Sequence, residues 1–408
     1  MKFPPINEQI DIIKKGTEEL ISEEELIQKL EKSVKSGRPL RIKQGFDPTA
    51  PDIHLGHTVG IRKLREFQEL GHTIVLIIGD YTGMVGDPSG KSETRPRLTY
   101  EQVRENAKTY ENQFFKILDR SKTEVHYNGE WFSKMRFDEI MTLAAKFTVA
   151  RILERDDFTK RYQEGNPISL HEFFYPLMQG YDSVAIKSDV ELGATEQKFN
   201  LLAARHVQRE YNQEPQVVLT LPVLEGIDGS QRMSKSLGNY VGIDEPPEEM
   251  FGKIMSIPDN LIEKYFTLVT DYNLEQLQDV RNRLANPHIN PMSLKLELSG
   301  HTVSMYHGEK AAQAARQHFK QVFSKKELPD EMDEIIVNPD DDRMLVKILT
   351  DNEVVSSNGE GRRLIKQGAV KVNDKKISDI NYCLSAGEFV VKVGKRRFVK
   401  ILVKPVGS

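Results

Sequence analysis

The chain has 408 residues, of which 38% are hydrophobic and 29% charged, a balance typical of a soluble globular protein with two or three domains. No apolar run approaches the roughly 18 residues of a membrane span, and the N-terminus lacks the apolar stretch of a signal peptide, so we expect a cytoplasmic protein with no membrane association. The lone cysteine, Cys383, excludes an intramolecular disulfide and a zinc site built from several cysteines.

The net charge of −4 is unevenly distributed along the chain. Residues 343–408 hold fourteen Lys and Arg against six Asp and Glu, a net +8, which leaves −12 for the remaining 342 residues. A basic tail on an acidic body favours a nucleic-acid partner that docks partly through the tail. A chance cluster of solvated charges would give the same count.

Hydrophobic periodicity predicts an α/β fold for residues 1–242. The expected elements, in chain order, are a helix over 8–35, a strand over 40–46, a helix over 55–70, a buried strand over 73–79, mainly helical structure from about 100 to 210 and a buried strand over 215–224. Strands separated by long helical stretches indicate a doubly wound, Rossmann-like parallel sheet. We expect an insertion between its halves, at about 115–190.

The pattern changes after residue 242. Helical spacing continues to about residue 323, which predicts an all-α domain over 243–329. Residues 330–342 contain seven acidic residues and no basic one, which indicates an exposed acidic linker. The last segment, 343–408, has a helical first half and a strand-rich second half, which predicts a small basic α+β module.

Two histidines flank a glycine at the predicted start of the helix over 55–70. His54 and His57 are three residues apart and share one helical face, where unpaired backbone N–H groups favour an anion. Gly56 lets a flat base approach the backbone. Two ordinary surface histidines would have the same spacing, and the pair supplies too few ligands for zinc.

A polar loop about 180 residues further along the chain supplies a second signal. The segment 232–236 (RMSKS) carries Arg232, Lys235 and Ser236 and lies between two glycines. Such a loop can swing over a polyphosphate and place positive charge on it. Alone, the segment is better explained as a basic surface loop. The two clusters together favour ATP binding.

The segment 83–92 (GMVGDPSGKS) directly follows the strand over 73–79. It does not match a phosphate loop, because three residues separate its last two glycines where the pattern requires four. Its position still indicates a ligand-facing loop at the carboxyl end of the sheet, where Asp87, Lys91 and the following Arg95 would place one carboxylate and two cations.

Polar side chains share one helical face in the segment 175–182 (YPLMQGYD). Tyr175, Gln179 and Asp182 are spaced i, i+4, i+7 among apolar neighbours, which indicates the lining of a polar pocket rather than a solvent-facing stripe. Shortly after, the segment 193–197 (GATEQ) offers small residues, a carboxylate and an amide, groups suited to a ribose and a polarised carbonyl.

Five segments, taken in order, resemble the signatures of one family. They are GFDPTAPDIHLGH at 45–57, GDPSGK at 86–91, YPLMQGYD at 175–182, GATEQ at 193–197 and RMSKS at 232–236. They are similar to those of bacterial tyrosyl-tRNA synthetases, which are class I aminoacyl-tRNA synthetases, and the resemblance covers nearly the whole chain. It implies activation of L-tyrosine by ATP, with release of pyrophosphate, and transfer of tyrosine to the 3′ end of tRNA(Tyr).

The resemblance also implies roles for individual residues. The residues expected to hold ATP and steady its reacting phosphate are Thr49, His54, His57, Lys91, Arg95, Arg232, Lys235 and Ser236. Further ATP-binding positions are Asp47, Gly56, Gly193 and Glu196. The expected tyrosine-binding residues are Asp87, Tyr175 and Gln179 at the ammonium, Asp182 at the phenol, Gln197 at the carboxylate, and Lys43. Magnesium would enter with ATP as part of the substrate, and we expect no metal held tightly by protein ligands.

Position 43 departs from the family pattern. Many relatives have a tyrosine there that helps to hold the substrate hydroxyl, whereas this chain has Lys43. Recognition of the hydroxyl would then depend more on Asp182.

The basic tail resembles a small RNA-binding module that is shared with a ribosomal protein of the small subunit. The resemblance implies that Arg362, Arg363 and Lys366 lie on one helix and contact tRNA phosphates, which position the RNA without determining sequence. It also implies a homodimer formed through the insertion, and an anticodon-side role for the helical domain.

Three other functions share part of this pattern. Tryptophanyl-tRNA synthetases have a related fold, but an acidic group at the ring tip suits a phenol better than an indole. An RNA-binding scaffold without chemistry would have lost its ATP segments, and these are intact. A nucleotidyltransferase for another small acid would share the ATP segments but neither the pocket residues nor the basic tail.

Overall fold

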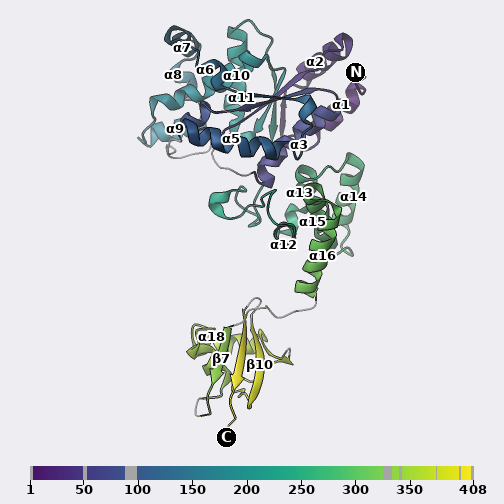
Figure 1. Cartoon of the computed structure of the whole chain (residues 1–408), viewed down its shortest axis with the longest axis vertical. Helices are drawn as coiled ribbons and strands as arrows, with labels where there is room; N and C mark the ends of the chain where they lie inside the picture. The colour runs from purple at the N-terminus through teal and green to yellow at the C-terminus, as the bar shows by residue number, and fades with distance from the viewer. Residues whose placement is uncertain are drawn as a thin grey trace. The chain divides into compact units, whose positions relative to one another are not determined.

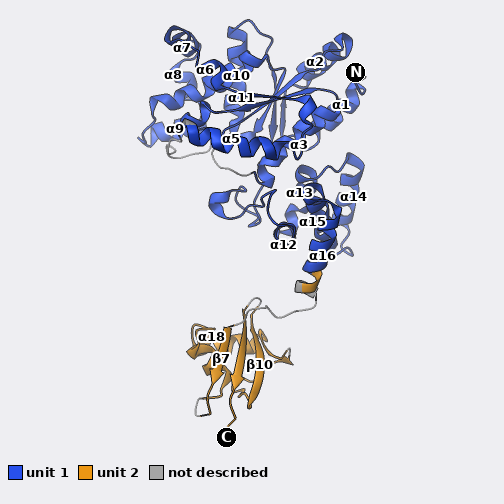
Figure 2. Ribbon diagram, in the orientation of Figure 1, with its two compact units in different colours: residues 1–319 blue, residues 320–408 orange. Residues whose placement is uncertain are grey.

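The computed structural model describes residues 3–48, 53–87, 99–324, 333–339, 342–373, 375–394 and 397–405. The chain divides into two compact units, residues 1–319 and 320–408, which are coloured separately in Figure 2. Each unit has a hydrophobic core of its own. Within the described ranges, no helix is long and apolar enough to cross a membrane.

A six-stranded sheet forms the centre of the first unit (Figure 1). Its strands are β1 (Glu19–Ile21), β2 (Arg41–Phe46), β3 (Thr73–Ile78), β4 (Thr123–Tyr127), β5 (Val190–Ala194) and β6 (Val217–Leu221). Their spatial order is β1-β6-β5-β2-β3-β4, and all pairs are parallel except β1 with β6. The chain therefore reverses its direction of winding between β2 and β5. This confirms the doubly wound fold, whose switch point is the usual ligand site.

Helices cover both faces of this sheet. Those outside the insertion are α1 (Ile6–Lys14), α2 (Glu23–Ser36), α3 (Leu55–Glu69), α4 (Thr82–Val85), α5 (Tyr100–Phe114), α10 (Phe174–Ile186) and α11 (Lys198–Glu210). In β3, Ile74, Leu76 and Ile78 pack into the main core, whereas Val75 and Ile77 pack into a separate cluster on the other face. Burial on both faces explains the continuous apolar run in the sequence.

Three short strands lie where helices were predicted, so those parts of the prediction are wrong. The predicted helix over 8–35 is divided into α1 and α2 with β1 between them. Gly16 follows α1 with a left-handed backbone (φ 66°), and the Ser22 hydroxyl accepts from the Glu25 N–H at 3.2 Å to start α2. Strands β4 and β5 have five residues each, too few to stand out in a region of mainly helical spacing.

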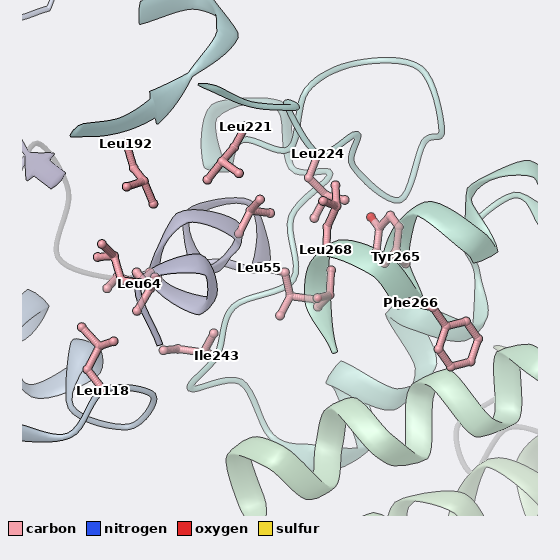
Figure 3. Close-up of a cluster of buried hydrophobic side chains, with 14 of the residues drawn as sticks. Leu55, Leu64, Leu118, Leu192, Leu221, Leu224, Ile243, Tyr265, Phe266 and Leu268 are labelled. Carbon is pink, nitrogen blue, oxygen red and sulfur yellow. The ribbon is translucent and has the colours of Figure 1, made fainter. Parts of the chain in front are cut away.

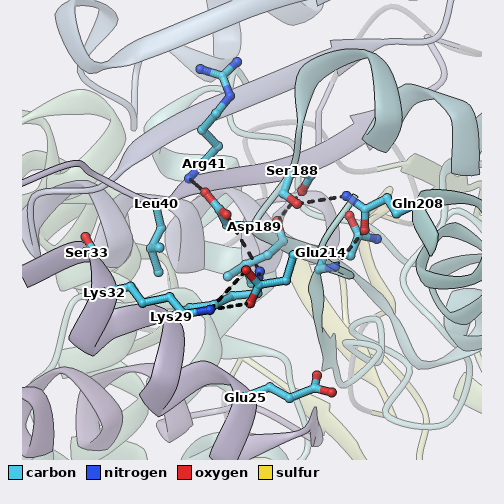
Figure 4. Close-up of polar contacts among 12 residues, drawn as sticks. Glu25, Lys29, Lys32, Ser33, Leu40, Arg41, Ser188, Asp189, Gln208 and Glu214 are labelled. Atoms are coloured by element: carbon cyan, nitrogen blue, oxygen red, sulfur yellow. Dashed lines mark hydrogen bonds and ion pairs between the residues drawn. The ribbon is translucent and has the colours of Figure 1, made fainter. Parts of the chain in front are cut away.

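Polar contacts hold the amino ends of β2 and β5 together (Figure 4). A carboxylate oxygen of Asp189 accepts from the N–H of Arg41 at 2.9 Å, and the N–H of Asp189 donates to the carbonyl of Arg41 at 2.9 Å. The ammonium of Lys29 lies 3.8 Å from Asp189 and 3.6 Å from Glu214. The register of β2 with β5 is therefore fixed at the end opposite the switch-point site.

The insertion consists of short helices. They are α6 (Gly129–Phe132), α7 (Phe137–Ala144), α8 (Val149–Ile152) and α9 (Asp156–Gln163). The insertion begins later than the predicted residue 115, because β4 belongs to the central sheet.

The helical segment that follows shares its core with the sheet. Its helices are α12 (Pro247–Met255), α13 (Ile262–Val269), α14 (Leu274–Ala285), α15 (Pro291–His307) and α16 (Glu309–Ser324). Leu55 of α3, Ile243 and Leu268 of α13 belong to one continuous cluster, as Figure 3 shows. A compact unit therefore extends to residue 319 with no break at 242.

The C-terminal unit is a five-stranded sheet with two described helices. Its elements are β7 (Asp333–Val337), α17 (Leu345–Asp351), α18 (Asn358–Lys366), β8 (Val370–Val372), β9 (Lys375–Lys376), β10 (Gly387–Val393) and β11 (Arg397–Val403). The strand order is β7-β11-β10-β8-β9. β7 lies within the segment predicted as a linker, and that part of the prediction is wrong. Ile335 and Val337 of this strand are buried in the core. Their alternating apolar pattern is short, and the acidic residues around it led to the prediction of a linker.

Candidate active site

The histidine cluster begins α3, as the sequence predicts. The His54 and His57 rings stack at a centroid distance of 3.8 Å, and the N–H of His54 donates to Nδ1 of His57 at 3.3 Å. Burial, the neighbouring His57 and Lys235 lower the pKa of His54 to about 2, and burial with Lys235 lowers that of His57 to about 4. Both rings are therefore neutral at pH 7. Nδ1 of His54 is buried and has no partner among the described residues.

The basic loop and the histidine cluster are in direct contact. The N–H of Gly56 points at the sulfur of Met233 at 3.3 Å, and a Cβ on Gly56 would lie 3.4 Å from Cβ of Met233. Arg232 forms an ion pair with Glu196 at 3.1 Å. The Lys235 ammonium lies 6.0 Å from the centre of the Tyr240 ring. The histidine cluster and the basic loop, which are far apart in the sequence, therefore lie side by side in the fold.

Asn239, which sequence reasoning missed, holds the basic loop in shape. Its side-chain oxygen accepts from the N–H of Ser234 at 2.8 Å. Its amide nitrogen donates to Asp228 at 2.7 Å and to the carbonyl of Arg232 at 3.1 Å. The side chain is buried, although no motif in the sequence singles it out.

The polar face of α10 points to the switch point. The Tyr175 hydroxyl donates to Asp47 at 2.7 Å, and the same carboxylate accepts from the Thr82 hydroxyl at 2.7 Å. The Gln197 amide donates to Asp87 at 3.1 Å. Asp47, predicted to bind ATP, thus lies beside the residues predicted to bind tyrosine.

Asp182 is almost fully buried and is held by two donors that the sequence did not predict. One carboxylate oxygen accepts from the indole N–H of Trp131 at 2.9 Å, and the other from the Asn128 amide at 3.4 Å. Burial raises the pKa of Asp182 to about 7, while Lys43, Trp131 and Asn128 oppose that rise. No spacing rule links residue 131 to residue 182, because the insertion brings them together only in the folded chain.

Lys43 does not face the cavity. Its side chain is fully buried and its ammonium forms an ion pair with Glu191 at 2.8 Å. It also donates to the Gln179 carbonyl and to the Ser183 hydroxyl, each at 2.8 Å. An ammonium has three hydrogens, so these contacts account for all of them. The placement of Lys43 among residues that touch tyrosine is therefore wrong.

Two adjoining cavities lie over the switch point. The larger has a volume of about 540 Å³. Its lining includes the predicted residues Asp47, His54, Gly56, His57, Asp87, Tyr175, Gly193, Glu196, Gln197, Arg232, Lys235 and Ser236. The smaller cavity contains Gln179 and Asp182 and shares Asp47, Tyr175 and Gln197 with the larger one. Thr49, Lys91 and Arg95 lie outside the described residues.

Family models match both parts of the chain. Residues 35–324 match the tRNA synthetases class I (W and Y), and residues 323–401 match the C-terminal domain of the tyrosine–tRNA ligase SYY-like type. The chain therefore belongs to the class I tRNA synthetases, and the two motifs beside one doubly wound sheet agree with this assignment.

Similar proteins narrow this further. The tyrosine–tRNA ligase of Carboxydothermus hydrogenoformans is 53% identical over 408 residues, which cover 98% of this chain and 99% of that protein. The tyrosine–tRNA ligase of Oleidesulfovibrio alaskensis is 54% identical over 98% of this chain and its own full length (100%). The crystal structure of tyrosyl-tRNA synthetase from Archaeoglobus fulgidus with L-tyrosine shares the fold, with a TM-score of 0.62 at 23% identity over 76% of this chain and 100% of that one. Within the class, the chain belongs to the tyrosine–tRNA ligase family.

Proposed function

We propose that the chain activates L-tyrosine with ATP, releasing pyrophosphate, and transfers tyrosine from the adenylate to the 3′ end of tRNA(Tyr). One observation carries the proposal: Asp182 lies in a small cavity that shares lining residues with the larger one, which is lined by the two ATP motifs. A buried acceptor beside the proposed nucleotide site suits the phenolic hydroxyl of tyrosine. The indole of tryptophan has no hydroxyl to pair with it.

The remaining tyrosine contacts follow from the same cavity. Asp87, Tyr175 and Gln179 would bind the ammonium group, and the carboxylate of Asp47 adds to the negative charge beside Tyr175. Gln197 would orient the substrate carboxylate. We assign no direct substrate contact to Lys43.

The residues of the larger cavity suit attack of that carboxylate on the α-phosphate of ATP. The nucleophile is already ionised at neutral pH, so the reaction needs positioning and stabilisation of phosphate charge rather than a general base. Neutral His54 and His57 would donate hydrogen bonds, and Arg232, Lys235 and Ser236 would contact the phosphates, with Thr49, Lys91 and Arg95. Asp47, Gly56, Gly193 and Glu196 would contact the nucleoside.

Magnesium would be bound mainly by the phosphates of ATP. Mg²⁺ in such sites usually keeps several waters and takes few protein ligands. Among the described residues, no group of three or more His, Cys, Asp or Glu could hold a metal ion. The described lining of the cavity places the cations Arg232 and Lys235 beside carboxylates and two amides, and these cations suit the phosphates of ATP that brings its own Mg²⁺.

ATP–pyrophosphate exchange with each of the twenty amino acids, offered singly, tests the proposal. We expect exchange with tyrosine alone, because only tyrosine satisfies Asp182. Exchange with tryptophan would instead support the tryptophanyl alternative. If the folded chain binds RNA but supports pyrophosphate exchange with no amino acid, the result would support the alternative of an RNA-binding scaffold without chemistry.

We assign tRNA binding in part to the C-terminal unit. Arg362, Arg363 and Lys366 all lie on α18 and are exposed, while Gly361 and Ile365 of the same helix are buried. This amphipathic arrangement presents the three cations together, which suits contacts to RNA phosphates. A tRNA partner implies a cytoplasmic location, where translation uses the product.

We further propose that the insertion forms a homodimer contact. The insertion, together with the segment that joins it to α10, exposes five large apolar side chains, with exposed fractions from 55% to 75%: Phe137, Met141, Val149, Tyr162 and Leu170. Large apolar side chains exposed in one part of the chain are candidates for an interaction site. A second copy of the chain is the partner that the resemblance implies.

Replacing both Phe137 and Leu170 by Asp should convert the dimer to a monomer, because the contact would have to bury two carboxylates. Sedimentation at about 1 μM should show the native mass halved, and replacing exposed Leu274 of α14 by Asp is the matched control. An unchanged mass would place the dimer contact elsewhere.

A further inference from the structure

A buried ion pair lies directly beneath the proposed tyrosine site. Lys43 of β2 and Glu191 of β5 are register partners across the switch point, and both side chains are 0% exposed. The ammonium of Lys43 lies 2.8 Å from a carboxylate oxygen of Glu191. A buried pair of this kind often adds little stability over apolar residues of the same size, which leaves room for a role other than stability.

The pair is connected to α10 by hydrogen bonds on both sides. Lys43 donates to the backbone carbonyl of Gln179 and to the Ser183 hydroxyl, each at 2.8 Å. Ser183 in turn donates to Glu191 at 3.3 Å, and the Gln216 amide donates to the same carboxylate. The pair therefore fixes both the backbone and the environment of Gln179.

The Gln179 side chain has only one orientation that this network permits. Its Nε2 donates to Glu191 at 3.0 Å. A carboxylate only accepts hydrogen bonds, so the opposite amide orientation would place two acceptor oxygens against each other. The oxygen, Oε1, is consequently turned away from Glu191. It is buried, and no described residue donates to it.

The residue that carries the unpaired oxygen is part of the lining of the proposed substrate cavity. Gln179 lines the smaller cavity together with Tyr175 and Asp182. A buried carbonyl oxygen without a donor is unfavourable until a ligand supplies one. The ammonium group of tyrosine has three donors and is the positively charged part of the substrate.

We propose that the Lys43–Glu191 pair is a positioning device, which orients the Gln179 amide so that its oxygen accepts from the ammonium of bound tyrosine. The inference rests on the proposed function. Neither charged residue touches the substrate. Lys43 and Glu191 act on the pKa of Asp182 in opposite directions, so removal of both should disturb recognition of the phenol less than removal of Lys43 alone.

The test is a neutral double variant, Lys43→Met with Glu191→Leu, in the full-length chain. Its affinity is compared with that of the native chain for L-tyrosine and for 3-(4-hydroxyphenyl)propionate, which is tyrosine without the ammonium. We expect tyrosine affinity to fall about 10- to 100-fold, the usual value of a hydrogen bond to a charged group. Affinity for the analogue should stay within about twofold. Calorimetric titration measures both.

The matched control removes a second buried ion pair. Among the described residues, one other ion pair has both side chains less than 5% exposed. Arg161 and Glu172 lie 2.6 Å apart, and Arg161→Met with Glu172→Leu removes a similar buried pair away from the cavity. This variant should preserve the ratio of the two affinities. If the first variant does not fold, Glu191→Gln serves instead, since it keeps the shape and frees the amide of Gln179 to turn.

The outcomes separate the two proposals. Equal losses for tyrosine and the analogue, or no loss for tyrosine, would overturn the positioning role. A native chain that binds neither compound would overturn the proposed function itself.

Discussion

The Asp182→Ala variant is expected to lose the preference for tyrosine over phenylalanine. In the native chain, phenylalanine brings no hydroxyl to the buried Asp182 and sets an apolar ring edge against it, whereas the alanine variant has no acceptor there with which to favour a hydroxyl. Sites of this kind reject the analogue that lacks the hydroxyl by about 10⁵-fold, a figure for which tyrosyl-tRNA synthetases are themselves the standard example and which does not come from this structure. The kinetics of pyrophosphate exchange give kcat/KM for tyrosine and for phenylalanine, and the ratio of these two values measures the preference. The KM for ATP should not change.

Melting curves at two pH values separate this effect from misfolding. Burial raises the pKa of Asp182 from 3.8 to about 7, so its contribution to stability is fully present below pH 3.8 and is lost as the pH rises through 7. Loss of stability in the variant should therefore be smaller at pH 8 than at pH 5. A preference for tyrosine that survives in a folded variant would remove Asp182 from the pocket.

Deletion of the C-terminal unit should leave tyrosine activation intact and reduce tRNA charging by about 100-fold or more, the order expected when several phosphate contacts are lost. The cut belongs after Ser324, because a cut at residue 343 would retain β7 without the strand that it pairs with. Pyrophosphate exchange measures activation, and acylation of tRNA(Tyr) measures charging.

The triple variant Arg362→Ala, Arg363→Ala, Lys366→Ala is a finer form of this deletion. It should also reduce charging, because three exposed cations are lost while the buried side of α18 is kept. Charging that remains at the native rate after the full deletion would give the unit another role.

The sequence predicted those features that depend on short-range pattern. The apolar run at 73–79 identified β3, and the helix start at His54 placed the histidines at an anion-binding end. The contact between Gly56 and Met233 shows that the two motifs are adjacent in the fold. β1 remained hidden because three residues at a sheet edge carry almost no periodic signal.

Contacts between distant segments could not be predicted in the same way. Trp131 contacts Asp182 only because the insertion folds back on the sheet. Lys43 was placed in the pocket by resemblance, yet its partner Glu191 is 148 positions away and determines where the ammonium points. Asn239 likewise acts through tertiary contacts that leave no motif.

The distribution of hydrophobic cores has a consequence for folding. One cluster joins α3 to α13 and α15, so the sheet and the following helices should gain and lose their structure cooperatively. The last 89 residues bury a separate cluster and can melt independently. During synthesis, the first unit can thus reach its native state before the C-terminal unit has been completed.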